Sequence, residues 1–255
     1  MSETMLQGDH MKLTLAETKF LKESVGIIAD IVTEVRFNVT ANAVELIAMD
    51  PANVAMVVFK LLGSAFAEYD VKKDCVVAVN LNDLKSVLRR VKPSDTLTME
   101  LEENKLKITL KGSSKREFLI PLIDVDEKEQ KIPDLNFTAT VQTHSDVFSD
   151  AVEDADIIGE SVSLGLENGM FVISSSSDLS KARIELTTDE NTKIEGAETV
   201  RSKYSIEYLK RMITANKLAP NVAISFSQDY PLKVEYKIVD KMDLMFILAP
   251  RVDND

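Results

Sequence analysis

The sequence has little cysteine and few residues of the kinds that interrupt regular structure. Its 255 residues include one cysteine, eight glycines and seven prolines, and no tryptophan. A single cysteine excludes an internal disulfide and a metal site built from several cysteines, and it is typical of a reducing compartment. We expect Cys75 to be a small core residue, because it begins the apolar run CVVAV.

Long apolar runs and targeting signals are also missing. No stretch approaches the roughly 18 uninterrupted apolar residues that a membrane-spanning helix needs. Residues 1–10 (MSETMLQGDH) contain neither the basic nor the apolar segment of a secretory signal. We therefore expect residues 1–10 to form a flexible leader, and we expect no membrane partner.

The usual catalytic signatures are absent as well. The chain contains no GxGxxG, GxxxxGK[ST], HExxH or GxSxG motif. The acidic stretch from Asp124 is reminiscent of a calcium-binding loop, but Glu129 and Leu135 stand where such a loop needs Gly and Glu. We therefore expect no catalytic residue, no metal and no cofactor. A remote alternative is an acidic hydrolase that uses the paired carboxylates Asp124 and Asp126 in a cleft.

An internal repeat is the most informative feature that the sequence does contain. Three segments recur after 125 or 126 residues. They are NLNDLK at 80–85 and SIEYLK at 205–210, LKITL at 106–110 and LKVEY at 232–236, and NAVELIAMD at 42–50 and NGMFVIS at 168–174. Three matches at a common offset indicate that one structural unit is duplicated in the chain.

Each copy alternates helical and strand periodicity. Apolar residues recur at helical spacing in residues 20–31, 81–91, 147–155 and 206–213. Between these segments, short runs such as LTMEL alternate apolar and polar residues, as strands do. This order predicts an α+β fold made of two copies of one domain. The boundaries that we predict are 11–121 for the first copy, 122–134 for an exposed, extended acidic connector and 135–255 for the second copy.

The net charge of −12 argues against nucleic acid as a partner, because affinity for phosphate comes from lysine and arginine. The charge is unevenly distributed, however. The second and fourth predicted helices carry +3 and +2, the first is neutral, and the third carries −5. The four helices sum to zero, so the excess acid lies elsewhere. This pattern is compatible with a DNA-facing surface inside an acidic body.

Five segments resemble the sliding clamps of the proliferating cell nuclear antigen family, above all its archaeal members. They are VELIAMD at 44–50, FLIPLIDVD at 118–126, SIEYLK at 205–210, PLKVEYKI at 231–238 and LAPR at 248–251. They stand in the order that the family has, and the likeness runs from Met11 to the end of the chain.

The resemblance implies a closed trimeric ring of DNA-clamp domains, two per subunit, with helices lining the inner face and antiparallel sheets outside. Such a ring encircles double-stranded DNA without reading its sequence and acts as a processivity factor, not as an enzyme. The implied partners are a second and third copy of the chain, replicative DNA polymerase, the clamp loader, flap endonuclease and DNA ligase, the last four through short peptide motifs. The implied location is the archaeal cytoplasm, at the nucleoid.

The resemblance also implies three surfaces. By position, the DNA-facing cations of the family fall on Lys22 and Arg89, and helical phase adds Lys85, Lys210 and Lys217. The pocket for partner peptides maps to Met49, Val54, Met56, Ile132, Pro231, Ile247, Ala249 and Pro250. The subunit interface maps to Glu117, Phe118 and Ile120 of one chain and to Lys181, Arg183 and Glu185 of the next.

One departure from the family leaves the assembly open. Eukaryotic relatives carry basic residues on the third helix, where this chain has Asp150 and Glu153, which repel phosphate. Either the DNA tilts toward the first domain, or a differently charged subunit shares the ring. The alternative to a homotrimer is therefore a subunit of a heterotrimeric or checkpoint-type clamp.

Overall fold

The computed structural model describes residues 10–125, 130–196 and 199–252, which form strands, four α-helices and two short 3-10 helices. The first-half strands are β1 (Met11–Leu15), β2 (Glu34–Val39), β3 (Ala43–Met49), β4 (Ala55–Leu62), β5 (Glu68–Val71), β6 (Cys75–Asn80), β7 (Thr96–Glu102), β8 (Lys105–Lys111) and β9 (Lys115–Pro121). The second-half strands are β10 (Ala139–His144), β11 (Ser161–Glu167), β12 (Met170–Ser176), β13 (Lys181–Leu186), β14 (Lys193–Gly196), β15 (Thr199–Ser205), β16 (Asn221–Phe226), β17 (Leu232–Ile238) and β18 (Met242–Leu248). The helices are α1 (Lys19–Ala29), α2 (Leu81–Leu88), α3 (Ser145–Asp156), α4 (Ile206–Ile213), η1 (Gly63–Ala65) and η2 (Thr214–Lys217).

The two halves repeat one strand order. The first half contains a five-stranded sheet, β5-β1-β7-β8-β9, and a row of four strands, β4-β3-β2-β6. The second half contains the five-stranded row β14-β10-β16-β17-β18 and the four-stranded sheet β13-β12-β11-β15. Adding nine to each strand number of the first half reproduces the second half. The recurrent sequence segments fall at matching places, since Asn80 and Ser205 are the N-cap residues of α2 and α4. The predicted duplication is confirmed.

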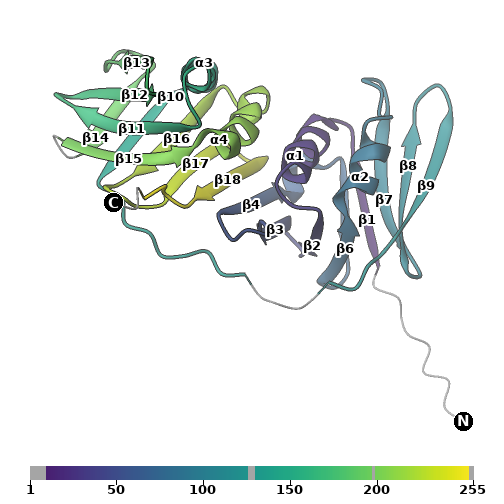
Figure 1. The fold of residues 1–255 in the computed structure, drawn as a ribbon. Helices are drawn as coiled ribbons and strands as arrows, with labels where there is room; N and C mark the ends of the chain where they lie inside the picture. Colours follow the sequence, from purple (N-terminus) through teal and green to yellow (C-terminus); the bar gives the residue numbers. More distant parts are fainter. Residues whose placement is uncertain (1–9, 126–129, 197–198, 253–255) are drawn as a thin grey trace, which may run out of the picture.

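One strand pair joins the halves. β18 pairs antiparallel with β4, from Met242 opposite Leu61 to Leu248 opposite Ala55. The pair is packed in the core, where Phe59 and Phe246 are almost fully buried. It fuses four strands of the first half and five of the second into one nine-stranded sheet (Figure 1).

The four helices lie side by side in the order α3, α4, α1, α2 (Figure 1). The 3-10 helix η2 packs against both α1 and α3, so the helices of the two halves form one continuous layer. In α1 the apolar stripe predicted from the sequence, which includes Phe20, Val25 and Ile28, is the buried side of the helix. Among the described residues, no helix is long and apolar enough to cross a membrane.

Two predicted helix ends were wrong. We expected helices through Ile31 and Val91, but α1 ends at Ala29 and α2 at Leu88. The N–H groups of Ile31 and Val91 donate to Ile28 and Leu88, three residues back, so the chain tightens into a turn while both side chains stay buried. Periodicity alone does not distinguish such a turn from a further helical turn. Similarly, Lys217 lies on η2 and not on α4.

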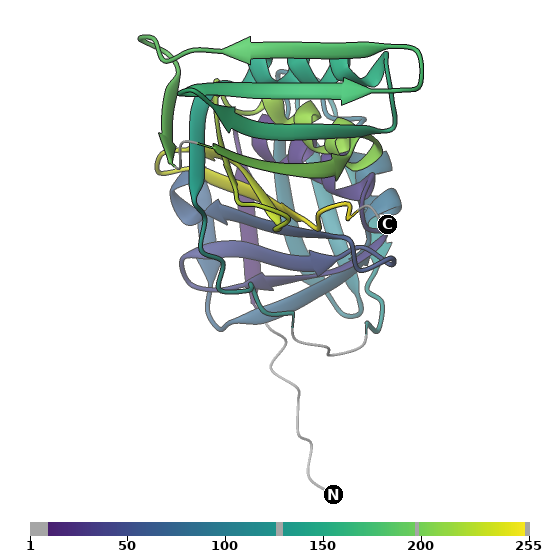
Figure 2. The same cartoon turned by 60° about the vertical axis from the view of Figure 1, so that its left-hand side comes forward.

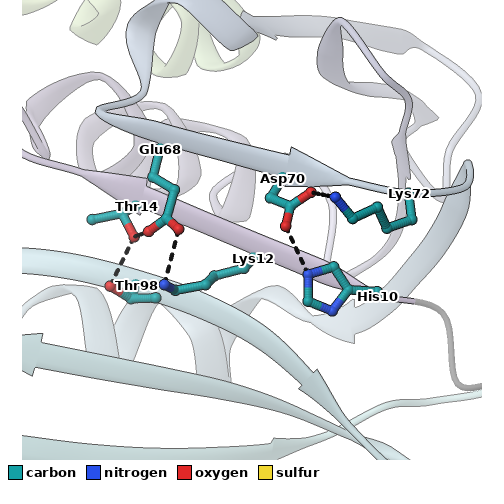
Figure 3. Close-up of polar contacts among 7 residues, drawn as sticks. All are labelled: His10, Lys12, Thr14, Glu68, Asp70, Lys72 and Thr98. Atoms are coloured by element: carbon teal, nitrogen blue, oxygen red, sulfur yellow. Dashed lines mark hydrogen bonds and ion pairs between the residues drawn. The ribbon is translucent and has the colours of Figure 1, made fainter.

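Polar contacts link β1 to its neighbours on the exposed face of the five-stranded sheet β5-β1-β7-β8-β9 (Figure 3). Lys12 Nζ and the Thr14 hydroxyl both donate to Glu68 on β5, at 2.9 Å and 3.2 Å. His10, which we assigned to the leader, contacts Asp70 at 2.9 Å. The rest of the predicted leader lies outside the described residues. Cys75 is buried, as predicted.

Gly165 allows β11 and β15 to lie close together. A Cβ atom at this position would stand 2.9 Å from the carbonyl oxygen of Val200. We predict that Gly165→Ala lowers the free energy of unfolding by about 1–3 kcal/mol, the usual cost of overpacking. Gly26 on α1 is the matched control, because nothing lies within 4 Å of its Cβ position and alanine favours a helix by about 0.5–1 kcal/mol. Urea denaturation measures both effects, and equal effects at the two positions would contradict the close approach.

Candidate functional site

Four of the five cations that we predicted to face DNA line one groove in the helical layer. Lys22 of α1, Lys85 of α2, Arg89 at the C-cap of α2 and Lys217 of η2 line a groove of about 280 Å³. The groove forms there because α1 packs against both α2 and η2. The fifth cation, Lys210, does not line it. The sequence alone did not distinguish Lys210 from the other four cations, because helical phase places all five on outward faces.

Acidic side chains of the same groove hold two of its lysines. Lys85 Nζ lies 2.6 Å from an oxygen of Asp30, and Lys217 Nζ lies 2.7 Å from an oxygen of Glu23. The second pair bridges the two halves of the chain. These ion pairs orient the ammonium groups, but an incoming anion has to compete with the carboxylates. From the sequence, Glu23 and Asp30 were recognisable only as charges on a neutral helix and not as partners of these lysines.

The acidic character of α3 persists in the structure. Lys210 Nζ donates to Asp156 at 2.6 Å, which links α4 to α3 and raises the pKa of Lys210 through that hydrogen bond and the charge of Asp156. Asp150 and Glu153 are exposed on the same helix. The helical layer therefore has a basic groove beside an acidic helix.

The predicted peptide pocket corresponds to an apolar row on the nine-stranded sheet. Met49 on β3 pairs with Met56 on β4, which pairs with Ile247 on β18, so the three side chains share one face. Beside the row, the Ala249 N–H donates to the Val54 carbonyl at 2.9 Å. Met56 and Ile247 are 4% and 7% exposed. The more accessible part of this apolar surface is formed by Met49, Val54, Pro231, Ala249 and Pro250.

The eighth residue of the predicted pocket, Ile132, lies on the connector and is 46% exposed. Figure 2 shows the described parts of the connector running along the outside of the nine-stranded sheet, with the helices behind it. The start of the connector is anchored, because the Ile123 N–H donates to the Ala78 carbonyl of β6 at 3.0 Å. Residues 126–129 lie outside the described residues.

The predicted interface residues lie on two edge strands. β9 is the edge of the five-stranded sheet and β13 is the edge of the four-stranded sheet. Glu117 on β9 and Lys181, Arg183 and Glu185 on β13 are exposed, whereas Phe118 is half-buried. Ile120 is 4% exposed and already belongs to the core of its own half. β9 and β13 are the counterparts, in the repeated unit, of the joined strands β18 and β4.

A contact that the sequence analysis missed positions the loop before β4. The Asp50 carboxylate accepts hydrogen bonds from the N–H groups of Ala52, Val54 and Ala55, at 2.7–3.2 Å. It also accepts one from the hydroxyl of Tyr208 on α4, at 2.6 Å. Asp50 thus closes a turn within the first half and binds the second half. The Asp-Pro-Ala-Asn sequence at this point was a turn signal, but nothing local pointed to Tyr208.

The hydrogen bonds also set the charge of this carboxylate. Burial by itself raises the pKa of Asp50, but the N–H of Ala55, the hydroxyl of Tyr208 and the N–H of Val54 together lower it below its ordinary value of 3.8. The hydrogen bond to Asp50, together with burial, raises the pKa of Tyr208 to about 12. At neutral pH the pair is therefore a carboxylate that accepts from a neutral phenol.

Comparison with known proteins decides the family. The family model described as "Proliferating cell nuclear antigen, N-terminal domain" matches residues 10–131, and its C-terminal counterpart matches residues 131–251. The chain belongs to the proliferating cell nuclear antigen family. A protein of Nanoarchaeum equitans named "DNA polymerase sliding clamp" is 34% identical over 95% of this chain and 100% of its own length. Its namesake from Pyrococcus abyssi is 36% identical over 88% of this chain and 91% of its own length.

A solved member of the family has the same fold. The crystal structure of PCNA from Thermococcus kodakaraensis superposes with a TM-score of 0.88 at 26% sequence identity, and covers 94% of this chain and 100% of that chain. The two-domain organisation typical of the proliferating cell nuclear antigen family is thus present in this chain. In the part of the chain that the structure describes, no group of three or more His, Cys, Asp or Glu side chains could hold a metal ion.

The Asp50–Tyr208 contact should stabilise the junction between the two clamp domains. We predict that Tyr208→Phe lowers the free energy of unfolding by about 0.5–1.5 kcal/mol, and that Asp50→Ala costs more, because it leaves the buried N–H of Ala55 and the half-buried N–H of Val54 unpaired. In a double-mutant cycle the effect of Tyr208→Phe should vanish in the Asp50→Ala background. Urea denaturation at one protein concentration measures these values.

The same contact predicts a dependence on pH. Because the pKa of Asp50 is lowered on folding, the contribution of its charge to the free energy of unfolding is fully present above pH 3.8. This contribution is lost as the pH falls through the lower pKa of the folded state. The stability difference between the parent chain and Asp50→Ala should therefore be constant near neutral pH and shrink below about pH 4. A difference that shrinks near pH 6 would contradict this assignment.

Proposed function

We propose that three copies of the chain close into a ring that encircles duplex DNA and tethers DNA polymerase to it, as a non-catalytic sliding clamp. The strand pairing between the two halves carries this proposal. β18 pairs with β4 inside the chain, and their counterparts β9 and β13 are edge strands of the described sheets. Pairing β9 of one copy with β13 of the next repeats the internal junction and satisfies both edges. Head-to-tail contacts of this kind generate a ring when the rotation closes.

Side chains on the two strands suit such a contact. Phe118 on β9 and Ile184 on β13 are partly buried residues that pack against the core. Pairing the strands would extend that core across the contact, with Ile120 supporting it from within its own half. On the exposed side of the paired strands, Glu117 would lie near Lys181 and Arg183. Glu185 is the fourth charged residue on that side. Leu119 on β9 is 51% exposed and would be covered.

The assembly is tested first by light scattering of the purified chain. A mass of three chains is expected, because each copy offers both edge strands. Leu119→Lys should lower the mass to that of one chain, since it sets a further cation beside Lys181 and Arg183 of the next copy. Val239→Lys is the matched control, because Val239 is 74% exposed in the turn after β17 and should leave the trimer intact. A parent chain that stays monomeric would argue against the homotrimer.

The basic groove is the proposed DNA-facing surface. Lys22, Lys85, Arg89 and Lys217 lie together in the helical layer, and in the ring this layer would line the hole. Lys210 would contribute from α4 if DNA competes with Asp156 for its ammonium group. Enclosure holds the ring on DNA even when each phosphate contact is weak, so sliding needs no base recognition.

The acidic helix α3 supplies a test of this orientation. Asp150→Lys combined with Glu153→Lys should tighten binding to a short duplex at low salt and steepen its salt dependence, because new cations displace more counterions. Asp74→Lys combined with Glu190→Lys changes the net charge equally at exposed loops outside the helical layer. Fluorescence anisotropy with labelled DNA compares the two. Equal tightening in both would mean that the helical layer is not the DNA-facing surface.

The apolar surface of Met49, Val54, Pro231, Ala249 and Pro250 is the proposed docking site for partner peptides, with Met56 and Ile247 beneath it and Ile132 of the connector beside it. Methionine adapts to different ligands, which suits a site shared by several partners. By family likeness these partners are replicative DNA polymerase, the clamp loader, flap endonuclease and DNA ligase. The connector offers backbone groups that could pair with a bound peptide as an added strand.

A subunit of a heterotrimeric or checkpoint-type clamp is the second candidate, and the exposed acids of α3 favour it. A differently charged partner subunit would compensate for Asp150 and Glu153. The remote alternative, an acidic hydrolase, has little support, because Asp124 is exposed, and Asp126 lies outside the described residues. We retain residues 11–121, 122–134 and 135–255 as the proposed domain boundaries, and we propose the archaeal cytoplasm, at the nucleoid, as the location.

A further inference from the structure

A basic cleft lies on the second half of the molecule, separate from the helical groove. It has a volume of about 730 Å³ and is lined by β11, β12, β13 and β15 and by the C-terminal segment. Its cationic residues are Lys181, Arg183, Arg201, Lys203 and Arg251. Serines of β11 and β12 supply hydroxyl groups, and Glu160 alone is acidic among the described residues that line it. In a chain with a net charge of −12, this concentration of positive charge points to an anionic ligand.

Two arginines of the cleft are held by neutral groups. Arg201 Nη2 donates to the Ser163 hydroxyl at 3.0 Å. Arg251 Nη1 donates to the Glu160 carbonyl at 3.3 Å and to the Ser161 hydroxyl. These bonds orient the guanidinium groups through neutral partners, so each retains its capacity for a carboxylate or phosphate. The charge of Arg201 also helps to lower the pKa of Glu167, but the hydrogen bond from Arg183 is the larger cause.

Arg183 differs from these two arginines. Its guanidinium is paired with Glu167 at 2.8 Å and with Glu185 at 2.6 Å. Arg183 and Lys181 also lie on β13, which the proposed ring contact would cover. The wall of the cleft that remains available in a ring is therefore the one formed by β11, β15 and Arg251.

The C-terminal segment connects this cleft to the apolar docking surface. The Ala249 N–H donates to Val54 of that surface, and two residues later the Arg251 N–H donates to the Lys203 carbonyl at 2.7 Å. Two extended residues span roughly 7 Å. A peptide seated on the apolar surface would therefore extend toward the cleft at one of its ends.

The chemistry of the cleft favours the carboxylates of a polypeptide. No aromatic side chain is among its described lining residues, so it lacks the stacking platform that single-stranded nucleic acid uses. We propose that Arg201 and Arg251 bind acidic residues that flank the apolar anchors of a partner peptide. This inference rests on the proposed function, because it requires a peptide on the apolar surface. It assigns the cleft a role in selecting among partners that share the same anchors.

The test uses the full chain and one labelled peptide with aliphatic and aromatic anchors. The peptide carries four Asp, four Ser or four Lys residues at either end, and anisotropy reports its affinity. At low salt the acidic tail at one end should bind about tenfold more tightly than the serine tail, the effect of two partly exposed ion pairs. The Lys tail at that end should bind more weakly than the serine tail.

Matched variants locate the effect. Arg201→Gln combined with Arg251→Gln should abolish the preference for the acidic tail while leaving the affinity of the serine-tailed peptide unchanged, which also shows that the variant is folded. Lys72→Gln combined with Lys237→Gln removes the same charge outside the cleft and should retain the preference.

Other outcomes would overturn the proposal in distinguishable ways. Equal affinity for all tails at both ends, with the anchors still bound, would sink the inference and leave the docking surface standing. Failure of every peptide to bind would refute the docking surface and the inference together. If acidic tails have no effect but inorganic phosphate binds the parent chain and not the Arg201→Gln, Arg251→Gln variant, the cleft is a phosphate site instead.

Discussion

The pairing of β4 with β18 is the contact on which the rest of the molecule depends. Each repeated unit ends in strands whose backbone N–H and C=O groups need partners, and an unpaired edge invites uncontrolled association. Within the chain, one pair of edges is satisfied, because the edge strand β4 of the first half pairs with the edge strand β18 of the second half. The equivalent strands β9 and β13 remain at the edges of their sheets. The same constraint that holds the two halves together is therefore also the reason to propose that copies of the chain assemble through β9 and β13.

The junction also brings the helices of both halves into one layer. Across it, the Arg211 guanidinium donates to the Asp30 carbonyl, and Lys217 pairs with Glu23. The basic groove consequently contains residues of both halves, and neither half could form it alone. The net negative charge of the chain is therefore compatible with the proposed DNA-facing surface. Four cations lie together in the groove where the helices of the two halves meet, whereas acidic residues lie on α3 and outside the helical layer.

On the opposite side of the sheet, the same junction creates a surface of a different kind. Asp50 closes the turn before β4 and accepts a hydrogen bond from the Tyr208 hydroxyl. The loop that borders the apolar surface is therefore fixed to the second half. The C-terminal segment then passes from Val54 to β15, where Arg251 reaches the serine-lined cleft. The apolar surface and the serine-lined basic cleft are thus joined by one short stretch of backbone. A binding surface with both properties can discriminate between partners without changing its anchors.

The sequence by itself determined the duplication, the α+β class, the buried faces of the helices and the family likeness. Repeat offsets and the periodicities of helix and strand are local properties, so residues such as Phe20, Val25 and Cys75 could be assigned to the core without coordinates. It did not determine where α1 and α2 end, because the tight turns at Ile31 and Val91 keep the same apolar spacing as a helix.

Only the tertiary structure decided which charged residues act together. It brought Lys22, Lys85, Arg89 and Lys217 into one groove and paired Lys210 with Asp156 instead. It joined Asp50 to Tyr208, and it gathered the basic cleft from strands and a C-terminal segment that no motif connects. These groupings depend on strand pairing and helix packing between residues far apart in the chain, for which a local pattern carries no information.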